Sequence, residues 1–65
     1  MKFAVYHVTN GWLVDTGVGG TWTWTVDDAE WFDSPEDAIA SLRACDIIEP
    51  EQDPHALGYT FPRVR

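Results

Sequence analysis

Few side chains in this sequence are of a type that carries out chemistry, and their spacing matches no familiar reactive arrangement. The histidines are His7 and His55, and the single cysteine is Cys45. Neither histidine has a neighbour at a metal-ligand spacing such as H-E-x-x-H. A cysteine and a histidine can act as nucleophile and base. Cys45, however, falls on the apolar stripe of a predicted helix, where a small buried thiol is the ordinary interpretation.

Two further patterns that sometimes mark a reactive site also fail here. The glycine-rich TGVGGT, residues 16–21, lacks the lysine of a P-loop and the third glycine of a dinucleotide fingerprint. The carboxylates from Asp27 to Asp37 lack the glycine that a calcium loop needs at its sharp turn. Paired-carboxylate catalysis requires a cleft, and 65 residues leave little room for one. We therefore predict no metal, no cofactor and no enzymatic activity.

The feature that stands out is negative charge. Eleven Asp and Glu residues against four Lys and Arg residues give a net charge of −7. Ten of these carboxylates lie between residues 27 and 53, where Arg43 is the only base. Such a field opposes direct binding to nucleic acid or to an anionic membrane. Two interpretations stay open, namely a solvated surface that keeps a small protein soluble and a surface that binds a basic partner.

The density of these carboxylates approaches that of DNA. A duplex carries one charge per ~1.7 Å of axis. A compact chain of this length is about 28 Å across, so ten carboxylates give about one per 3 Å. A strip of this kind would fit a basic groove built for nucleic acid, with similar gains from counterion release and electrostatic steering. The residues predicted to bind such a partner are Asp27, Asp28, Glu30, Asp33, Glu36, Asp37, Asp46 and Glu49.

The elements that position these residues can be predicted from apolar patterning. Residues 2–8 and 21–26 alternate and are rich in β-formers, and residues 12–16 form the returning strand after a turn, which predicts three strands. Asn10 and Gly11 predict a tight hairpin turn with both residues at positive φ, and residues 17–20 predict a loop. Trp22 and Trp24 would share one sheet face. Whether that pair lies under the helix or contacts a partner is left open.

A helix is predicted from Ser34–Pro35 to about Asp46. Ser34 is a favourable N-cap, and Pro35 suits the first helical position. Ala38, Ile39, Leu42 and Cys45 form its apolar stripe. Residues 49–54 predict a loop, and residues 56–64 a last strand with Leu57, Tyr59 and Phe61 on one face. Pro62 confines that strand to a sheet edge or ends it.

These elements predict an α+β fold, an antiparallel sheet of three to four strands with one α-helix packed on one face. The length predicts a single domain over residues 1–65, and we expect a monomer. No apolar run approaches the ~20 residues of a membrane span. One cysteine is typical of a reducing compartment. We therefore expect a cytoplasmic protein.

Three segments of the chain resemble a pattern common in small proteins encoded by bacteriophages and prophages. In that pattern a hairpin ends in Gly-Trp, a "WT" strand follows, and A-x-x-F-x-S-x-E-x-A opens a helix. The matching residues, within about residues 3–44, are Gly11, Trp12, Trp24, Thr25, Ala29, Phe32, Ser34, Glu36 and Ala38.

Small acidic phage proteins include anti-CRISPR proteins, some of which are similar to DNA in charge and block the DNA-binding groove of a type I surveillance complex. The resemblance implies a DNA-mimicking inhibitor of this kind, whose partner is a basic DNA-binding complex in the cytoplasm of the host bacterium. The alternative is a phage accessory protein that binds another host protein through an aromatic face, without DNA mimicry. Neither alternative needs catalytic residues.

Overall fold

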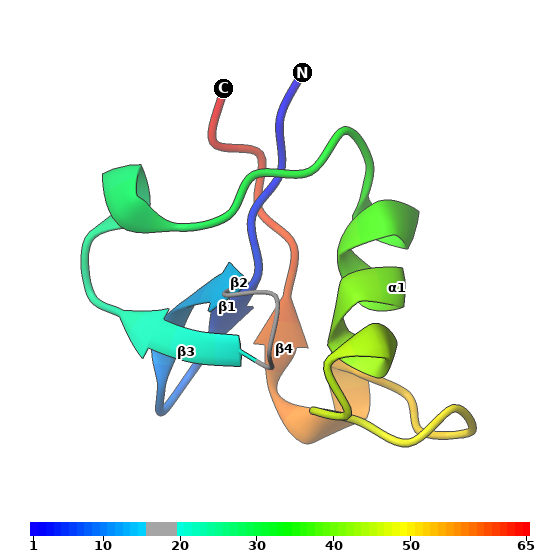
Figure 1. The fold of residues 1–65 in the computed structure, drawn as a ribbon. Helices are drawn as coiled ribbons and strands as arrows, with labels where there is room; N and C mark the ends of the chain where they lie inside the picture. The colour runs from blue at the N-terminus through cyan, green and yellow to red at the C-terminus, as the bar shows by residue number, and fades with distance from the viewer. Residues whose placement is uncertain (16–19) are drawn as a thin grey trace.

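The computed structural model describes residues 1–15 and 20–65, which form a four-stranded antiparallel sheet and one α-helix (Figure 1). The strands lie in the order β3-β2-β1-β4. Their bounds are Tyr6–His7 for β1, Gly11–Asp15 for β2, Gly20–Thr23 for β3 and Tyr59–Thr60 for β4. Helix α1 spans Pro35–Ala44, and the short 3-10 helices are η1 (Val26–Asp28) and η2 (His55–Leu57). The predicted α+β fold is confirmed.

The core lies between one face of the sheet and α1. Leu13 and Tyr59 of the sheet, together with Val5 just before β1, are buried against Ala38 and Leu42 of the helix. Ile48 completes the cluster. The side chains of Trp22, Phe32, Ile47 and Phe61 pack around it. The predicted apolar stripe of the helix is therefore correct, although Ile39 and Cys45 at its margins are only half-buried.

The first strand is shorter than the predicted 2–8. Only Tyr6–His7 forms a regular strand, although Phe3 makes isolated bridges to Phe32 on one side and Arg63 on the other. The Phe3 amide donates to the Phe32 carbonyl oxygen at 2.8 Å, and the reverse bond is 2.7 Å. The N-terminal segment thus lies between two distant parts of the chain, and the two termini lie side by side (Figure 1).

The third strand ends at Thr23, so the predicted strand over 21–26 is too long. The Thr25 amide donates to the Thr23 hydroxyl oxygen at 3.2 Å, and η1 begins at Val26. A threonine side chain that bonds the backbone two residues later offers the chain a turn in place of a ladder. Gly20 belongs to β3, whereas Thr16 of the predicted second strand and the rest of the predicted 17–20 loop lie outside the described residues.

The first hairpin differs from the predicted turn. His7 pairs with Gly11, so residues 8–10 form the connection. Gly11 has φ +90°, but Asn10 is not at positive φ. A Cβ at Gly11 would lie 2.6 Å from the Thr23 carbonyl oxygen and 2.9 Å from Trp24 Cε3. Glycine is therefore required for conformation and for space, and only at the second residue of the pair.

Helix α1 begins as predicted and ends earlier. The Ser34 hydroxyl accepts from the Asp37 amide at 3.1 Å, which confirms the N-cap. The helix ends at Ala44, and Asp46 has φ 57°. The amides of Asp46 and Ile47 donate to the carbonyl oxygens of Arg43 and Leu42 at 3.1 and 3.0 Å. This is a Schellman ending, with aspartate at the position that glycine usually occupies.

The last strand is also shorter than predicted. Residues 55–57 form η2, Gly58 has φ +93°, and β4 contains only Tyr59–Thr60. Tyr59 is buried and Phe61 packs on the core, but Leu57 is 40% exposed. The expectation that these three share one face is therefore wrong for Leu57. The edge position that Pro62 predicted for this strand is correct.

Candidate partner-binding surface

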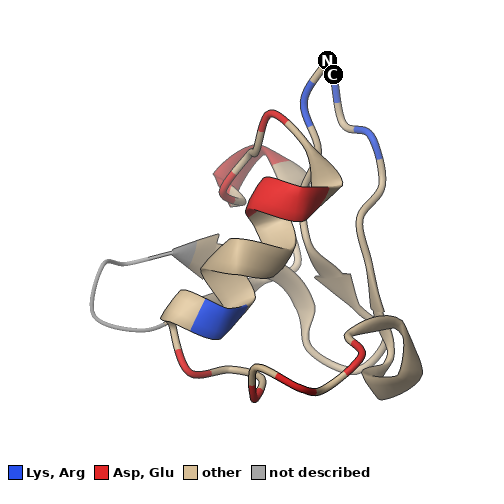
Figure 2. Cartoon of the chain, turned by 90° about the vertical axis from the view of Figure 1, so that its right-hand side faces the viewer, with Lys and Arg blue, Asp and Glu red and all other residues tan. Residues whose placement is uncertain are grey.

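All eight carboxylates predicted to bind a partner are exposed. They divide into two groups along the chain, one running from η1 to the first turn of α1 and one following the end of α1 (Figure 2). The N-terminal acidic group is Asp27, Asp28, Glu30, Asp33, Glu36 and Asp37. The C-terminal acidic group is Asp46 and Glu49, together with the exposed Glu51 and Asp53. Seven helical residues, 38–44, separate the nearest members of the two groups, Asp37 and Asp46, by about 10 Å of helix. The N-terminal acidic group itself extends from η1, on the side of the molecule away from α1, to the start of α1, so the structure does not gather it into one cluster.

Three of the four basic residues lie at the same end of the molecule as Asp33 of the N-terminal acidic group. Lys2, Arg63 and Arg65 belong to the two chain ends, which meet at one end of the molecule (Figure 2). Lys2 Nζ forms an ion pair with Asp33 Oδ1, and this hydrogen bond holds the pKa of the Asp33 carboxyl below its usual value. Within the described residues, no ion pair involves the other members of the two acidic groups. Sequence reasoning missed the Lys2–Asp33 pair because 31 positions separate its members.

Some of the acidic residues also have structural roles. Glu36 and Asp37 lie in the first turn of α1, where negative charge favours the helix dipole. Asp53 Oδ1 accepts from the His55 amide at 3.1 Å. By contrast, no such contact of the side chains of Asp27, Asp28 and Glu30 is seen in the part of the chain that the structure describes. Exchange of these three side chains should therefore disturb the fold little.

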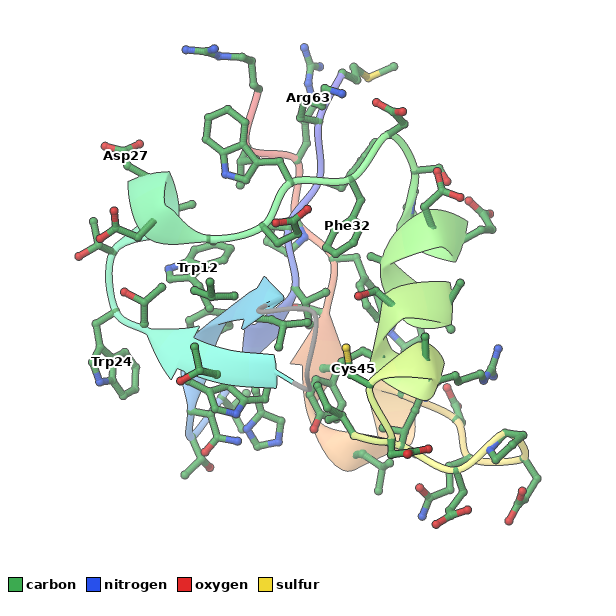
Figure 3. The ribbon with its side chains drawn as sticks, viewed as in Figure 1. Trp12, Trp24, Asp27, Phe32, Cys45 and Arg63 are labelled. Carbon is green, nitrogen blue, oxygen red and sulfur yellow. The ribbon has the colours of Figure 1, made fainter. Side chains whose placement is uncertain are left out.

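The two tryptophans predicted to share a face have separate environments. Trp22 packs against the core, with its ring centroid 6.1 Å from that of Tyr59. Trp24 follows the end of β3 and is 70% exposed. Figure 3 shows Trp24 and Asp27 on the same side of the molecule, away from α1. The divergence follows from the turn at Thr23–Thr25, which takes Trp24 out of the strand.

The His7 side chain bonds to two backbone groups, whereas the His55 side chain contacts an aromatic ring. His7 Nδ1 accepts from the Thr9 amide at 3.2 Å, so in the neutral ring Nε2 carries the hydrogen and donates to the Leu57 carbonyl oxygen at 3.0 Å. His55 lies edge-on to Phe61, with 5.4 Å between ring centroids. Cys45 is half-buried at the helix C-cap. Residues 1–15 and 20–65 contain no cluster of three His, Cys, Asp or Glu side chains placed to hold a metal ion, and no pocket.

Comparison of the chain with known protein families, curated proteins and solved structures finds no match. None of the helices in the described part of the chain has the length and apolar character needed to span a membrane. The fold and the surface together define a small α+β domain with exposed acidic groups at both ends of its single α-helix.

Proposed function

We propose that this protein is a small acidic inhibitor that occupies the basic DNA-binding surface of a host nucleic-acid-binding complex by imitating the charge of DNA. The observation that carries the proposal is the exposure of ten carboxylates in the two acidic groups, while three of the four bases lie at the chain ends. The resemblance to small phage proteins adds the target, which is the DNA-binding groove of a type I CRISPR surveillance complex.

The size of the molecule supports this proposal. Its Cα atoms extend over 29 × 22 × 21 Å. Averaged over the longest extent, ten carboxylates correspond to about one charge per 3 Å, within a factor of two of duplex DNA, although they do not form one continuous strip. Two acidic groups whose nearest members are separated by about 10 Å of helix would each meet lysine or arginine side chains that otherwise hold phosphates. Binding would then release counterions and depend strongly on salt.

The test uses neutralising changes at Asp27→Asn, Asp28→Asn and Glu30→Gln, which change the net charge by +3. These side chains have no structural role in the described residues, so the fold should be retained. We expect this variant to inhibit a purified type I CRISPR surveillance complex about tenfold less well, because each lost charge leaves a basic side chain of the groove without its partner. Competition with target DNA for the complex is the measurement.

A control variant distinguishes an effect of where the charges lie from an effect of net charge alone. Thr9, Thr21 and Ala56 are exposed and lie outside both acidic groups. Changing all three to lysine gives the same change of +3. If this control loses as much inhibition as the neutralised variant, only the overall charge matters and the imitation of phosphate positions is wrong. If the neutralised variant folds and inhibits normally, the N-terminal acidic group does not bind the complex.

A second candidate function is favoured by one observation, the 70% exposure of Trp24. A protein that binds another host partner through an aromatic anchor would keep its affinity at high salt, since apolar contacts are not screened. DNA mimicry would lose affinity steeply under the same conditions. Measuring the affinity for a captured partner between low and high salt distinguishes the two functions.

A further inference from the structure

Trp24 is exposed and yet held in place. The turn that follows β3 fixes its backbone, through the bond from the Thr25 amide to the Thr23 hydroxyl. Its six-membered ring lies against the α-carbon of Gly11, where an added Cβ would be 2.9 Å from Cε3 and 3.2 Å from Cδ2. Much of the indole nevertheless faces solvent, since the residue is 70% exposed. A large ring supported from behind in this way is suited to contact a partner without first losing conformational freedom.

The chain segment that follows this ring is anionic. Asp27 and Asp28 follow Trp24 in η1, are exposed, and take part in no ion pair within the described residues. Asp27 lies on the same side of the molecule as Trp24 (Figure 3). The sequence contains no lysine or arginine between residues 3 and 42. An exposed indole in such a field is complementary to a cation, because the negative face of the ring and the carboxylates attract the same charge.

The chemistry of the two side chains favours arginine over lysine as that cation. A guanidinium is planar and weakly hydrated, so it can stack on an indole at a small cost in hydration. An ammonium is compact and strongly hydrated, and it loses more on leaving water. The chain contains the same contact within itself, since the Arg65 guanidinium lies 5.2 Å from the centroid of the Trp31 ring.

We propose that Trp24, supported by Gly11 and accompanied by Asp27 and Asp28, receives an arginine side chain of the partner, so that the partner is recognised through arginine in preference to lysine. This inference rests on the proposed function in one respect, which is that the partner surface is basic. It adds that arginine is the partner residue that makes the contact, and that Trp24 is the residue of this protein that favours arginine.

The test compares two probes, nona-arginine and nona-lysine peptides, which carry equal charge. Their binding to the intact chain is measured by calorimetry at low salt. We expect the protein to prefer the arginine peptide, and Trp24→Leu to weaken that peptide by about two- to five-fold, the range for an exposed cation–π contact. The affinity for the lysine peptide should change less. Val8→Ala is the matched control, since Val8 is 67% exposed and apolar but has no π-face.

Three outcomes overturn the inference. These are equal binding of the two peptides, no binding of either, and a Trp24→Leu change that affects both peptides alike. Trp24→Phe keeps an aromatic ring over Gly11 and should retain part of the preference, so it serves as the test if the leucine variant fails to fold. If both peptides bind with equal affinity and the binding depends on salt, only this inference is contradicted and the proposed function is not. A preference for arginine in a protein that fails to displace DNA from the surveillance complex would reject only the proposed function.

Discussion

Asp46 occupies a backbone conformation that most side chains avoid. Its φ of 57° lies in the left-handed region, and its carboxylate follows the negative end of α1. We expect Asp46→Gly to raise the free energy of unfolding by about 1 kcal/mol, because glycine adopts this conformation without a Cβ clash. Urea denaturation followed by circular dichroism measures the change.

A second variant at this position separates the two causes. Asp46→Asn removes the charge and keeps a side chain that tolerates the left-handed region. If it gains as much stability as the glycine variant, the cost at Asp46 is electrostatic. If neither variant gains stability, our account of the helix end is wrong.

Burial of the Tyr59 hydroxyl makes the stability of the fold depend on pH in the alkaline range. Burial raises the pKa of this hydroxyl above the usual 10.0. A folded pKa above the unfolded one contributes stability that is fully present below pH 10.0 and is lost as the pH rises through the folded pKa. We expect the free energy of unfolding to fall above pH 10, and Tyr59→Phe to fall less steeply. Urea denaturation at pH 8 and pH 11 tests this, with Tyr6→Phe as the control tyrosine.

At the residue scale, the sequence predicted which side chains are exposed better than it predicted which side chains contact one another. The eight carboxylates are exposed because charged side chains lose hydration when buried without a partner. The Lys2–Asp33 ion pair, in contrast, depends on how the N-terminal segment docks beside residues 32 and 63. The exposure of Trp24 depends on a side-chain bond at Thr23, which alternation of residue types does not reveal.

At the element scale, two glycines at positive φ differ in how much space surrounds them. Gly11 and Gly58 have φ of +90° and +93°. An added Cβ at Gly11 would meet the Thr23 carbonyl oxygen at 2.6 Å, whereas at Gly58 the nearest atom is His7 Nε2 at 3.3 Å. We expect Gly58→Ala to cost about 1–2 kcal/mol of stability from backbone strain, and Gly11→Ala to cost more because β2 must also move away from β3.

The comparison of these two variants isolates the steric contribution at Gly11. Both are measured by urea denaturation under the same conditions. Since a chain of this size has a small margin of stability, Gly11→Ala is expected to be partly unfolded at 37 °C. Equal costs at the two sites would mean that the hairpin relaxes freely, and the close approach of β2 and the Trp24 ring would then have no energetic importance.

The helix was predicted well and the strands less well, for a physical reason. The start of α1 is determined by Ser34, Pro35 and Asp37, which lie within one turn of one another. Strand ends depend on distant partners, such as Arg63 and Phe32 on the two sides of Phe3. The short β4 likewise reflects the positive φ of Gly58 on one side and Pro62 on the other.

At the scale of the whole molecule, the sequence gives the number of charges, whereas the fold determines where they lie relative to one another. The chain ends bring three bases to one pole, while the length of α1 holds the two acidic groups apart. A single strip was predicted because residues 27–53 are continuous in sequence. The structure instead interposes the seven helical residues 38–44, of which Arg43 carries the only charge.

This arrangement leads to a prediction about salt and stability. Two like charges 10 Å apart in water repel by about 0.4 kcal/mol, and within each acidic group several such pairs exist. Screening acts over about 10 Å at 0.1 M salt, so salt should remove most of this repulsion. The Lys2–Asp33 attraction weakens as well, but it is one ion pair against many repulsions. We therefore expect the free energy of unfolding to rise from 10 mM to 0.5 M sodium chloride.

The variant with Asp27→Asn, Asp28→Asn and Glu30→Gln provides the internal comparison. It has fewer like charges in the N-terminal acidic group, so its stability should be higher at low salt and should rise less as salt is added. Chloride is used because sulfate stabilises proteins through exclusion from their surface, whatever their charge. Parallel salt profiles for the two proteins would show that the N-terminal acidic group does not strain the fold. Any higher stability of the neutralised variant at low salt would then have a cause other than charge repulsion within this group. The loss of stability from like charges would have to arise in the C-terminal acidic group.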